Sequence, residues 1–382
     1  MQPIVIIGSG LAGFNTVKEF RKLDKETPIV VLTSDDGRNY SKPMLSAGFT
    51  KEKTADDLCM ATPEKVAEQF NVEVRTDVHV AEIDPSGKRV LLPDDHLDYS
   101  KLVLALGADT WTPPLEGDAV GDVFSVNDLM DYGKFRTALK GAKKVTILGG
   151  GLIGCEFAND LSNGGYEVAL VEPQGRCLPL LLPEPASAAV GRGLADLGVT
   201  FHFGPLAQAV NHGDNNQLVT ELSDGSRIES DVVLSAIGLR PRIALAKEAG
   251  LAINRGIITD KTLQTSADDI YALGDCAEVQ GHVLPYVLPL MASARALAKT
   301  LAGETTAVSY GVMPVTIKTP ACPVVVCPPA DHDNGEWEIQ EDGNNVQALF
   351  RGKDGSLQGY ALTGDAVKEK MKLNKELPPL MP

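Results

Sequence analysis

Two segments of this 382-residue chain, about 140 residues apart, repeat one pattern: an apolar strand, a glycine-rich loop, a helix and a second apolar strand. In residues 3–35 the loop is Gly8-Ser9-Gly10-Leu11-Ala12-Gly13. In residues 144–172 it is Gly149-Gly150-Gly151-Leu152-Ile153-Gly154. Each segment has the order of a βαβ unit, so the repeat predicts two nucleotide-binding folds in one polypeptide.

The glycines of such a loop have separate tasks. The first permits a tight turn, the second lets a pyrophosphate approach the backbone, and the third lets the helix pack closely on the strand. The phosphates then lie at the positive end of the helix dipole. One loop alone is weak evidence, because glycines also mark ordinary turns, but both copies here follow a strand and open a helix. The predicted binding residues are Gly8, Ser9, Gly10, Leu11, Ala12 and Gly13 in the first loop, and Gly149, Gly151 and Gly154 in the second.

An acidic residue at the end of the second strand of such a unit binds a ribose diol and repels a 2′-phosphate. In the second copy this residue is Glu172, 23 positions after Gly149, which favours NADH over NADPH. Arg176 could instead accept a 2′-phosphate, but it lies beyond the strand, and a solvated arginine is the simpler interpretation. The first copy has Thr33, Ser34 and Asp35 at the corresponding place, so its acidic residue is less sharply positioned.

Composition restricts the partners and the compartment. The net charge of −16 disfavours nucleic acid and anionic membrane surfaces, because both repel an acidic protein. No run of about 18 apolar residues is present, and the N-terminus lacks the regions of a secretion signal. The cysteines number six, which is few for this length. We therefore expect a cytoplasmic protein with reduced thiols and no membrane insertion.

Helices alternate with short apolar strands through most of the chain, which predicts a mostly parallel sheet covered on both faces. From about Thr316 the character changes to prolines, an acidic stretch over residues 331–342, two strand-like segments and a closing charged helix. The predicted fold is α/β, with two Rossmann-like dinucleotide-binding domains, one inserted in the other, and a small α+β C-terminal domain. The expected bounds are 1–110 with 240–315, then 111–239 for the inserted domain, and 316–382.

Three further segments lie in the order found in flavoproteins with two dinucleotide sites. Leu104-Ala105-Leu106-Gly107-Ala108 and Ala236-Ile237-Gly238-Leu239-Arg240-Pro241 resemble the two crossover segments of these proteins. Ile270-Tyr271-Ala272-Leu273-Gly274-Asp275 resembles their flavin-ribityl motif. With both loops, the chain resembles the FAD-dependent pyridine nucleotide oxidoreductases over most of residues 1–315. The resemblance implies non-covalent FAD in the first domain, NADH in the inserted domain, and a hydrogen bond from Asp275 to the ribityl chain or pyrophosphate.

A more specific resemblance is to the bacterial rubredoxin-NAD reductases. It rests on Tyr40-Ser41-Lys42-Pro43-Met44-Leu45-Ser46 and on Pro314-Val315-Thr316-Ile317-Lys318-Thr319-Pro320. Aromatic residues that ferredoxin reductases have in the second segment are missing. The resemblance places five further residues at the cofactors: Lys42, Val80, Val287 and Lys318 at FAD, and Glu156 near the nicotinamide and the flavin. Positive charge from the two lysines is expected to stabilise reduced, anionic flavin.

The cysteines bear on the electron path. Related branches carry one or two redox cysteines after the FAD loop, whereas the matching stretch here, residues 40–49, contains none. Cys322 and Cys327 have C-x4-C spacing, but in an extended segment they point to opposite faces and lie too far apart to bridge. Cys155 and Cys276 have no partner in the sequence and are expected to be packing residues. No spacing typical of metal ligands is present, so no metal site is predicted.

Without a thiol relay, electrons must leave the flavin directly. The expected function is transfer from NADH through FAD to rubredoxin, supplying an alkane hydroxylase as in the family. No catalytic side chain is predicted, because the cofactors carry the chemistry and the protein sets distance and orientation. Rubredoxins are small and acidic, so we expect a local basic or apolar docking patch over the flavin edge.

Three other functions stay open on the sequence alone. One is a ferredoxin reductase of an aromatic dioxygenase, which turnover with rubredoxin and with a two-iron ferredoxin would separate. A second is a nitrite reductase large subunit, which shares the N-terminal signatures, but those chains continue into sirohaem and iron-sulfur regions whereas this sequence ends at Pro382. The third is an NADH-sensing signalling flavoprotein, which predicts slow turnover with every one-electron acceptor. A monomer or weak dimer is expected, because the C-terminal segment is short and acidic.

Overall fold

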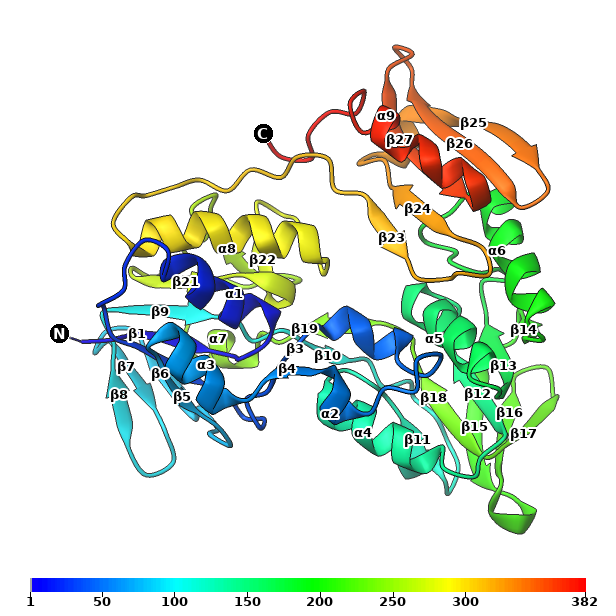
Figure 1. Cartoon of the computed structure of the whole chain (residues 1–382), viewed down its shortest axis with the longest axis horizontal. Coiled ribbons are helices and arrows are strands. Elements are labelled where there is room, and N and C mark those ends of the chain that lie inside the picture. Colours follow the sequence, from blue (N-terminus) through cyan, green and yellow to red (C-terminus); the bar gives the residue numbers. More distant parts are fainter. Residues whose placement is uncertain (1) are drawn as a thin grey trace.

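The computed structural model describes residues 2–382 and divides into three parts (Figure 1). The first part carries the first glycine loop and is built on a sheet with the strand order β21-β9-β1-β2-β5. Every pairing in this sheet is parallel, as the alternation of strands and helices predicts. Its strands are β1 (Ile4–Ile7), β2 (Ile29–Leu32), β5 (Glu73–Arg75), β9 (Lys101–Leu104) and β21 (Ile270–Ala272).

Helices α1 (Leu11–Phe20) and α8 (Val287–Leu301) lie side by side on this sheet (Figure 1). Their buried faces join the strands in one apolar core, which explains the spacing of the apolar residues in both helices. The remaining elements of this part are short: α3 (Pro63–Phe70), α7 (Ala244–Glu248), β6 (Glu82–Asp84), β7 (Arg89–Leu91), β8 (His96–Asp98), β20 (Ile257–Thr259), η4 (Gly274–Cys276) and β22 (Ala277–Val279).

The second part repeats this plan around a parallel sheet of order β11-β18-β12-β13-β14. An antiparallel sheet, β15-β16-β17, adjoins it. The elements are η2 (Val120–Asp122), β11 (Val123–Phe124), α4 (Leu129–Ala138), β12 (Lys144–Leu148), α5 (Leu152–Asn163), β13 (Glu167–Glu172), α6 (Glu184–Asp196), β14 (Thr200–Phe203), β15 (Ala207–His212), η3 (Asp214–Asn216), β16 (Leu218–Leu222), β17 (Arg227–Ser230) and β18 (Val232–Ser235).

Two short strands, β10 (Ala108–Thr110) and β19 (Leu239–Pro241), pair antiparallel where the chain leaves and re-enters the first part. The chain then returns to the first sheet, where β21 pairs with β9. The second part is therefore inserted in the first, and the predicted fold class is confirmed. The residue bounds of the domains stay a prediction.

A segment of the first part reaches across to the second. It contains β3 (Asn39–Tyr40), the 3-10 helix η1 (Lys42–Ala47), α2 (Ala55–Leu58) and β4 (Cys59–Ala61). Leu45 and Phe49 of this segment are buried in the same core as Phe135 of α4 and Phe157 of α5. This packing places the segment, which we call the Lys42 segment, alongside α5.

The C-terminal part is an antiparallel sheet of order β23-β24-β27-β26-β25. The acidic stretch contains its edge strand β25, which sequence patterning did not indicate because charged residues occupy nearly every other position. The closing helix is shorter than expected: a 3-10 segment, η6, precedes a four-residue α9. The elements are β23 (Val315–Ile317), β24 (Val324–Cys327), η5 (His332–Asn334), β25 (Gly335–Asp342), β26 (Asn345–Gly352), β27 (Leu357–Thr363), η6 (Gly364–Glu369) and α9 (Lys370–Leu373).

Within residues 2–382, none of the helices has both the length and the apolar composition that crossing a lipid bilayer requires.

Candidate functional site

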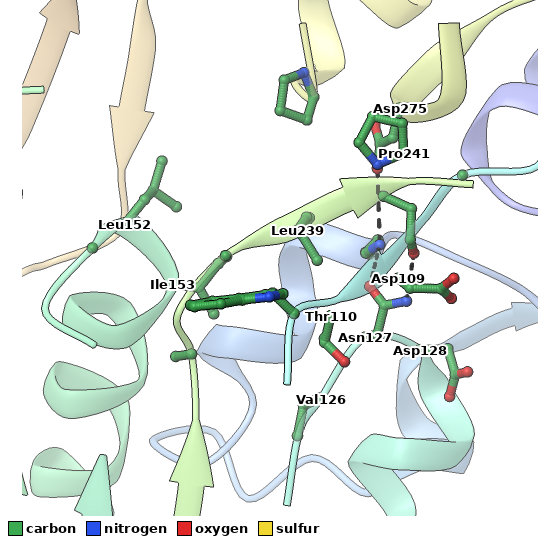
Figure 2. Close-up of a pocket in the computed structure, with 18 of the residues that line it drawn as sticks. Asp109, Thr110, Val126, Asn127, Asp128, Leu152, Ile153, Leu239, Pro241 and Asp275 are labelled. Carbon is green, nitrogen blue, oxygen red and sulfur yellow. Dashed lines mark hydrogen bonds and ion pairs between the residues drawn. The ribbon is translucent and has the colours of Figure 1, made fainter. Parts of the chain in front are cut away.

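A cleft of about 2340 Å³ runs between the first and second parts and is lined by residues of all three. Small-molecule sites are usually about 300–1,000 Å³, so this cleft has room for more than one such ligand. Figure 2 shows Leu152 and Ile153 of α5 at one end of the view and Asp275 at the other, with Thr110 and Leu239 of the crossover strands between them. The cleft therefore joins the two glycine loops.

The structure brings the predicted site residues together. All of them line the cleft except Gly13 and Gly154, the third glycine of each loop, which lie behind it. A Cβ atom on Gly13 would be 1.9 Å from the carbonyl oxygen of Gly8, and one on Gly154 would be 1.9 Å from that of Gly149. These two glycines therefore permit close packing of each helix on its loop, as the motif implies.

The loops leave space where a phosphate would approach. A Cβ atom on Gly10 or Gly151 would meet nothing within 4 Å. These two residues are the N-caps of α1 and α5, and neither helix has a side-chain cap. The first N–H groups of both helices thus keep donors for an anion, and the helix dipole favours negative charge there. Both loops fit a dinucleotide pyrophosphate.

The end of β2 is tied to the first loop by Asp35. Its Oδ1 accepts hydrogen bonds from Thr33 Oγ1 at 2.6 Å and from Ser9 Oγ at 3.0 Å. In the second copy, both carboxylate oxygens of Glu172 accept backbone hydrogen bonds. Gly150 N donates to Glu172 Oε2 and Gln174 N donates to Glu172 Oε1, each at 2.8 Å. Glu172 is nearly buried, so its charge faces the cleft from a fixed position.

Arg176, the residue that argued for a 2′-phosphate, does not line the cleft. Its Nη2 donates a hydrogen bond to the carbonyl oxygen of Pro179 at 3.2 Å. Arg176 is half-buried rather than solvated, and the Pro179 carbonyl that it binds belongs to a residue at the cleft. Of the two candidate side chains, only Glu172 lines the cleft. This arrangement favours NADH.

Lys42 lies at the centre of a polar group on the first-part side of the cleft. Its Nζ donates to Asn127 Oδ1 at 2.7 Å and forms an ion pair with Asp275, 3.9 Å from Oδ2 (Figure 2 shows both partners). Burial lowers the pKa of Lys42, whereas the carboxylate of Asp275 raises it. Asn127 was not predicted, because it belongs to no motif. Its Nδ2 donates to the carbonyl oxygen of Ala108 at 2.8 Å, which fixes the amide that holds the lysine.

A second polar group surrounds Glu156, whose side chain is almost fully buried. Its Oε2 accepts from Ser46 Oγ at 2.5 Å and from Lys318 Nζ, and its Oε1 accepts from Lys318 N at 2.9 Å. The carboxylate therefore joins η1, α5 and the residue that follows β23. The family resemblance suggested Glu156 and Lys318 separately. Neither their ion pair nor the hydrogen bond from Ser46 was predicted.

Cys155 and Cys276 adjoin Glu156 and Asp275 in the sequence, but their thiols do not reach the cleft. All six cysteines are free, and none of the described residues lining the cleft is a cysteine. Cys322 and Cys327 face different cores, as their spacing predicts. Cys155 is fully buried, as expected of a packing residue, but it has a neighbour that the sequence did not indicate. The Cys177 thiol and burial raise the pKa of Cys155, so the two thiols are adjacent beneath the second loop.

Comparison with known proteins agrees with this geometry. Residues 2–300 match the family model described as pyridine nucleotide-disulphide oxidoreductase, and residues 307–377 match the rubredoxin binding C-terminal domain. The chain is 85% identical to a rubredoxin-NAD(+) reductase of Alcanivorax borkumensis, with all of both chains covered. It is 43% identical to the enzyme of that name from Acinetobacter baylyi, covering 100% of this chain and 99% of the relative.

The fold is also that of solved reductases. A ferredoxin reductase from Rhodopseudomonas palustris superimposes with a TM-score of 0.88 at 24% identity, covering 99% of this chain and 96% of that one. The chain has two glycine loops on one cleft and an inserted nucleotide domain, and it resembles rubredoxin-NAD(+) reductases over its full length. The chain is an FAD- and NADH-dependent oxidoreductase, and it belongs to the rubredoxin-NAD(+) reductases of the pyridine nucleotide-disulphide oxidoreductase family.

Proposed function

We propose that the chain oxidises NADH and delivers the electrons, through FAD, to rubredoxin. One NADH supplies two electrons as a hydride, and two oxidised rubredoxins each take one, which leaves NAD⁺, two reduced rubredoxins and one proton. Bound FAD supplies the chemistry that links a two-electron donor to a one-electron acceptor. The chain's own residues bind, orient and shield the reactants.

The observation that carries this proposal is the meeting of three segments at Glu156. Lys318 belongs to the part of the chain that matches the rubredoxin binding domain, and it pairs with a carboxylate on the helix that begins at the second glycine loop. Ser46, in the same 3-10 helix as Lys42, completes the group. The C-terminal part, which matches the rubredoxin binding domain, is thus bonded directly to the cleft that joins the two glycine loops.

Each site residue has a proposed task that suits its surroundings. Gly10 and Gly151 offer open backbone to the pyrophosphates. Lys42 is held by Asn127 and Asp275, so its ammonium is oriented before a cofactor binds. Positive charge at Lys42 and Lys318 would stabilise negative charge on the reduced ring. Further proposed FAD contacts are those of Ser9, Leu11, Ala12, Thr33, Ser34, Asp35, Val80 and Val287, all of which line the cleft.

An anaerobic titration of the purified, FAD-loaded protein tests the proposal. NADH should bleach the flavin absorbance, and oxidised rubredoxin should restore it within one turnover. NADPH should bleach it with a much lower kcat/KM, because Glu172 faces the cleft. Faster reoxidation by a two-iron ferredoxin than by rubredoxin would reject the proposed acceptor, and a colourless protein that does not take up FAD would reject the whole scheme.

We further propose that the reduced rubredoxin serves an alkane hydroxylase. Support comes from the 85% identical relative, which carries the rubredoxin-NAD(+) reductase name and comes from Alcanivorax borkumensis. Reconstitution of the chain with rubredoxin and hydroxylase membranes should give NADH consumption that depends on added alkane. Alkane-independent consumption in the coupled system would contradict this step.

Two properties complete the proposal. The six free cysteines suit a reducing cytoplasm. The acidic edge strand β25 disfavours pairing of two copies through the C-terminal sheet, because like charges would face each other. We therefore propose a cytoplasmic monomer or weak dimer, and sedimentation velocity measures the oligomeric state directly.

A further inference from the structure

The C-terminal sheet has an inner and an outer face. Along β24, Val324 and Val326 are buried in the core that contains α6 residues, whereas Val325 is buried with Leu373 and Leu377. The inner face therefore packs on the second part, and η6 with α9 forms the outer layer. A partner that binds the C-terminal part can therefore contact either the outer layer or the exposed edge strand β25.

The edge suits an acidic partner poorly. Strand β25 pairs with β26 on one side only, and nearly all its residues are exposed. It carries four carboxylates, Glu336, Glu338, Glu341 and Asp342. A small acidic electron carrier would be repelled here, because like charges across an interface disfavour association.

The outer layer is more basic than the edge, with four lysines against three exposed acids, Asp365, Glu369 and Glu376. Lys368, Met371, Lys372 and Lys375 are all exposed and follow one another at intervals of three, one and three residues, which places them on one side of the segment. We call these four residues the docking stripe. Met371 is 65% exposed, so an apolar side chain lies among these lysines. Lys368 Nζ is paired with Asp365, whereas no ion pair engages Lys372 or Lys375 within the described residues. Leu373 and Leu377 point inward and hold the segment on the sheet.

The docking stripe borders the cleft. Lys370, which lies within the same segment, lines the cleft together with Lys318. Val287 and Leu288 at the start of α8 also line the cleft and are 41% and 48% exposed. Basic and apolar side chains thus line the cleft together, on a protein whose net charge is −16.

We infer that the docking stripe, together with Leu288, is the surface on which an acidic rubredoxin seats to collect electrons. The inference rests on the proposed function and adds the surface to it. Its lysines steer an acidic carrier to a chain that otherwise repels it, and its apolar centre lets the carrier approach closely. The matched family domain spans residues 307–377, and this inference selects one surface of it.

Charge reversal with a matched control tests the surface. The test variant is K372E/K375E, and the control is K140E/K143E, which changes charge equally at two exposed lysines with the same spacing. Figure 1 shows α4, which ends just before Lys140, on the far side of the molecule from α9. Both variants are compared with the wild type for rubredoxin reduction and for ferricyanide reduction by NADH, at low and at physiological salt.

The expected result is a fall in kcat/KM for rubredoxin of about tenfold or more in K372E/K375E at low salt, shrinking as salt rises. Ferricyanide reduction should stay at the wild-type value, and the control should behave as the wild type. M371Q should lower kcat/KM for rubredoxin at every salt concentration.

Three outcomes would overturn the inference. The first is unchanged rubredoxin kinetics in K372E/K375E, and the second is an equal loss in the control. The third is a change of oligomeric state, which would make the stripe a contact between copies of this chain. Absence of rubredoxin reduction in the wild type is a different result, since it rejects the proposed function itself.

Discussion

The buried carboxylate of Glu156 gives the sharpest test of how the parts are joined. Changing Glu156 to Gln keeps the size and one acceptor oxygen, which can still accept from Lys318 N. It removes the charge-assisted bond to Lys318 Nζ and weakens the bond from Ser46 Oγ. The variant therefore loses interactions with the C-terminal part and with the Lys42 segment at once.

The magnitude follows from the burial of the two partners. Breaking a fully buried ion pair costs about 3–5 kcal/mol, because the remaining charge has no partner. The Glu156 side chain is 1% exposed but that of Lys318 is 31% exposed, so water partly solvates the freed ammonium. We therefore expect a smaller loss in the free energy of unfolding, about 2 kcal/mol.

Urea unfolding of the FAD-loaded protein, followed by circular dichroism, measures this loss. The double variant E156Q/K318M removes both charges and should recover part of it, giving a coupling free energy of about 1 kcal/mol or more between the two sites. Independent, additive losses in the two single variants would refute the argument that the pair joins the domains. A loss of under about 0.5 kcal/mol for E156Q would refute it as well.

Two further predictions follow from the glycine loops and from a buried thiol. Gly154→Ala should lower the melting temperature, because the new Cβ would lie 1.9 Å from Gly149 O. In Gly151→Ala the new Cβ meets no atom within 4 Å, so this variant should keep the melting temperature but raise the Kd for NADH. Equal melting temperatures for the two variants would contradict this. Burial raises the pKa of Cys276 to about 11 from the ordinary thiol value of 9.0, so the folded state holds this proton after the unfolded state has lost it. Stability from the neutral thiol is thus present below pH 9 and is lost as pH rises towards 11. Cys276→Ala should show a smaller fall in unfolding free energy over that range than the wild type, and parallel curves would show the thiol to be irrelevant.

Local motifs made much of the site predictable. The loop glycines, Asp275 and Glu172 each act within a segment of about thirty residues, so their spacing alone places them at a strand end or a helix start. The structure puts all of these at the cleft or directly behind it. Their binding roles stay predictions until cofactor contacts are measured.

Contacts between distant segments could not be predicted in the same way. Asn127 holds Lys42 across 85 positions, and Ser46 meets Glu156 across 110. Neither Asn127 nor Ser46 was singled out as a site residue, because no periodicity or spacing links residues that meet only through domain packing. The neighbouring thiols of Cys155 and Cys177 escaped notice for the same reason.

The sequence by itself determined the two βαβ units, the order of the domains and the preference for NADH, because glycine conformation, helix starts and strand ends are local properties. Only the tertiary structure decided how Glu156 joins Lys318, which face of the C-terminal sheet is free, and where its lysines lie relative to the cleft. These depend on how separately folded units pack, since burial and ion pairing are set by atoms far apart in the chain.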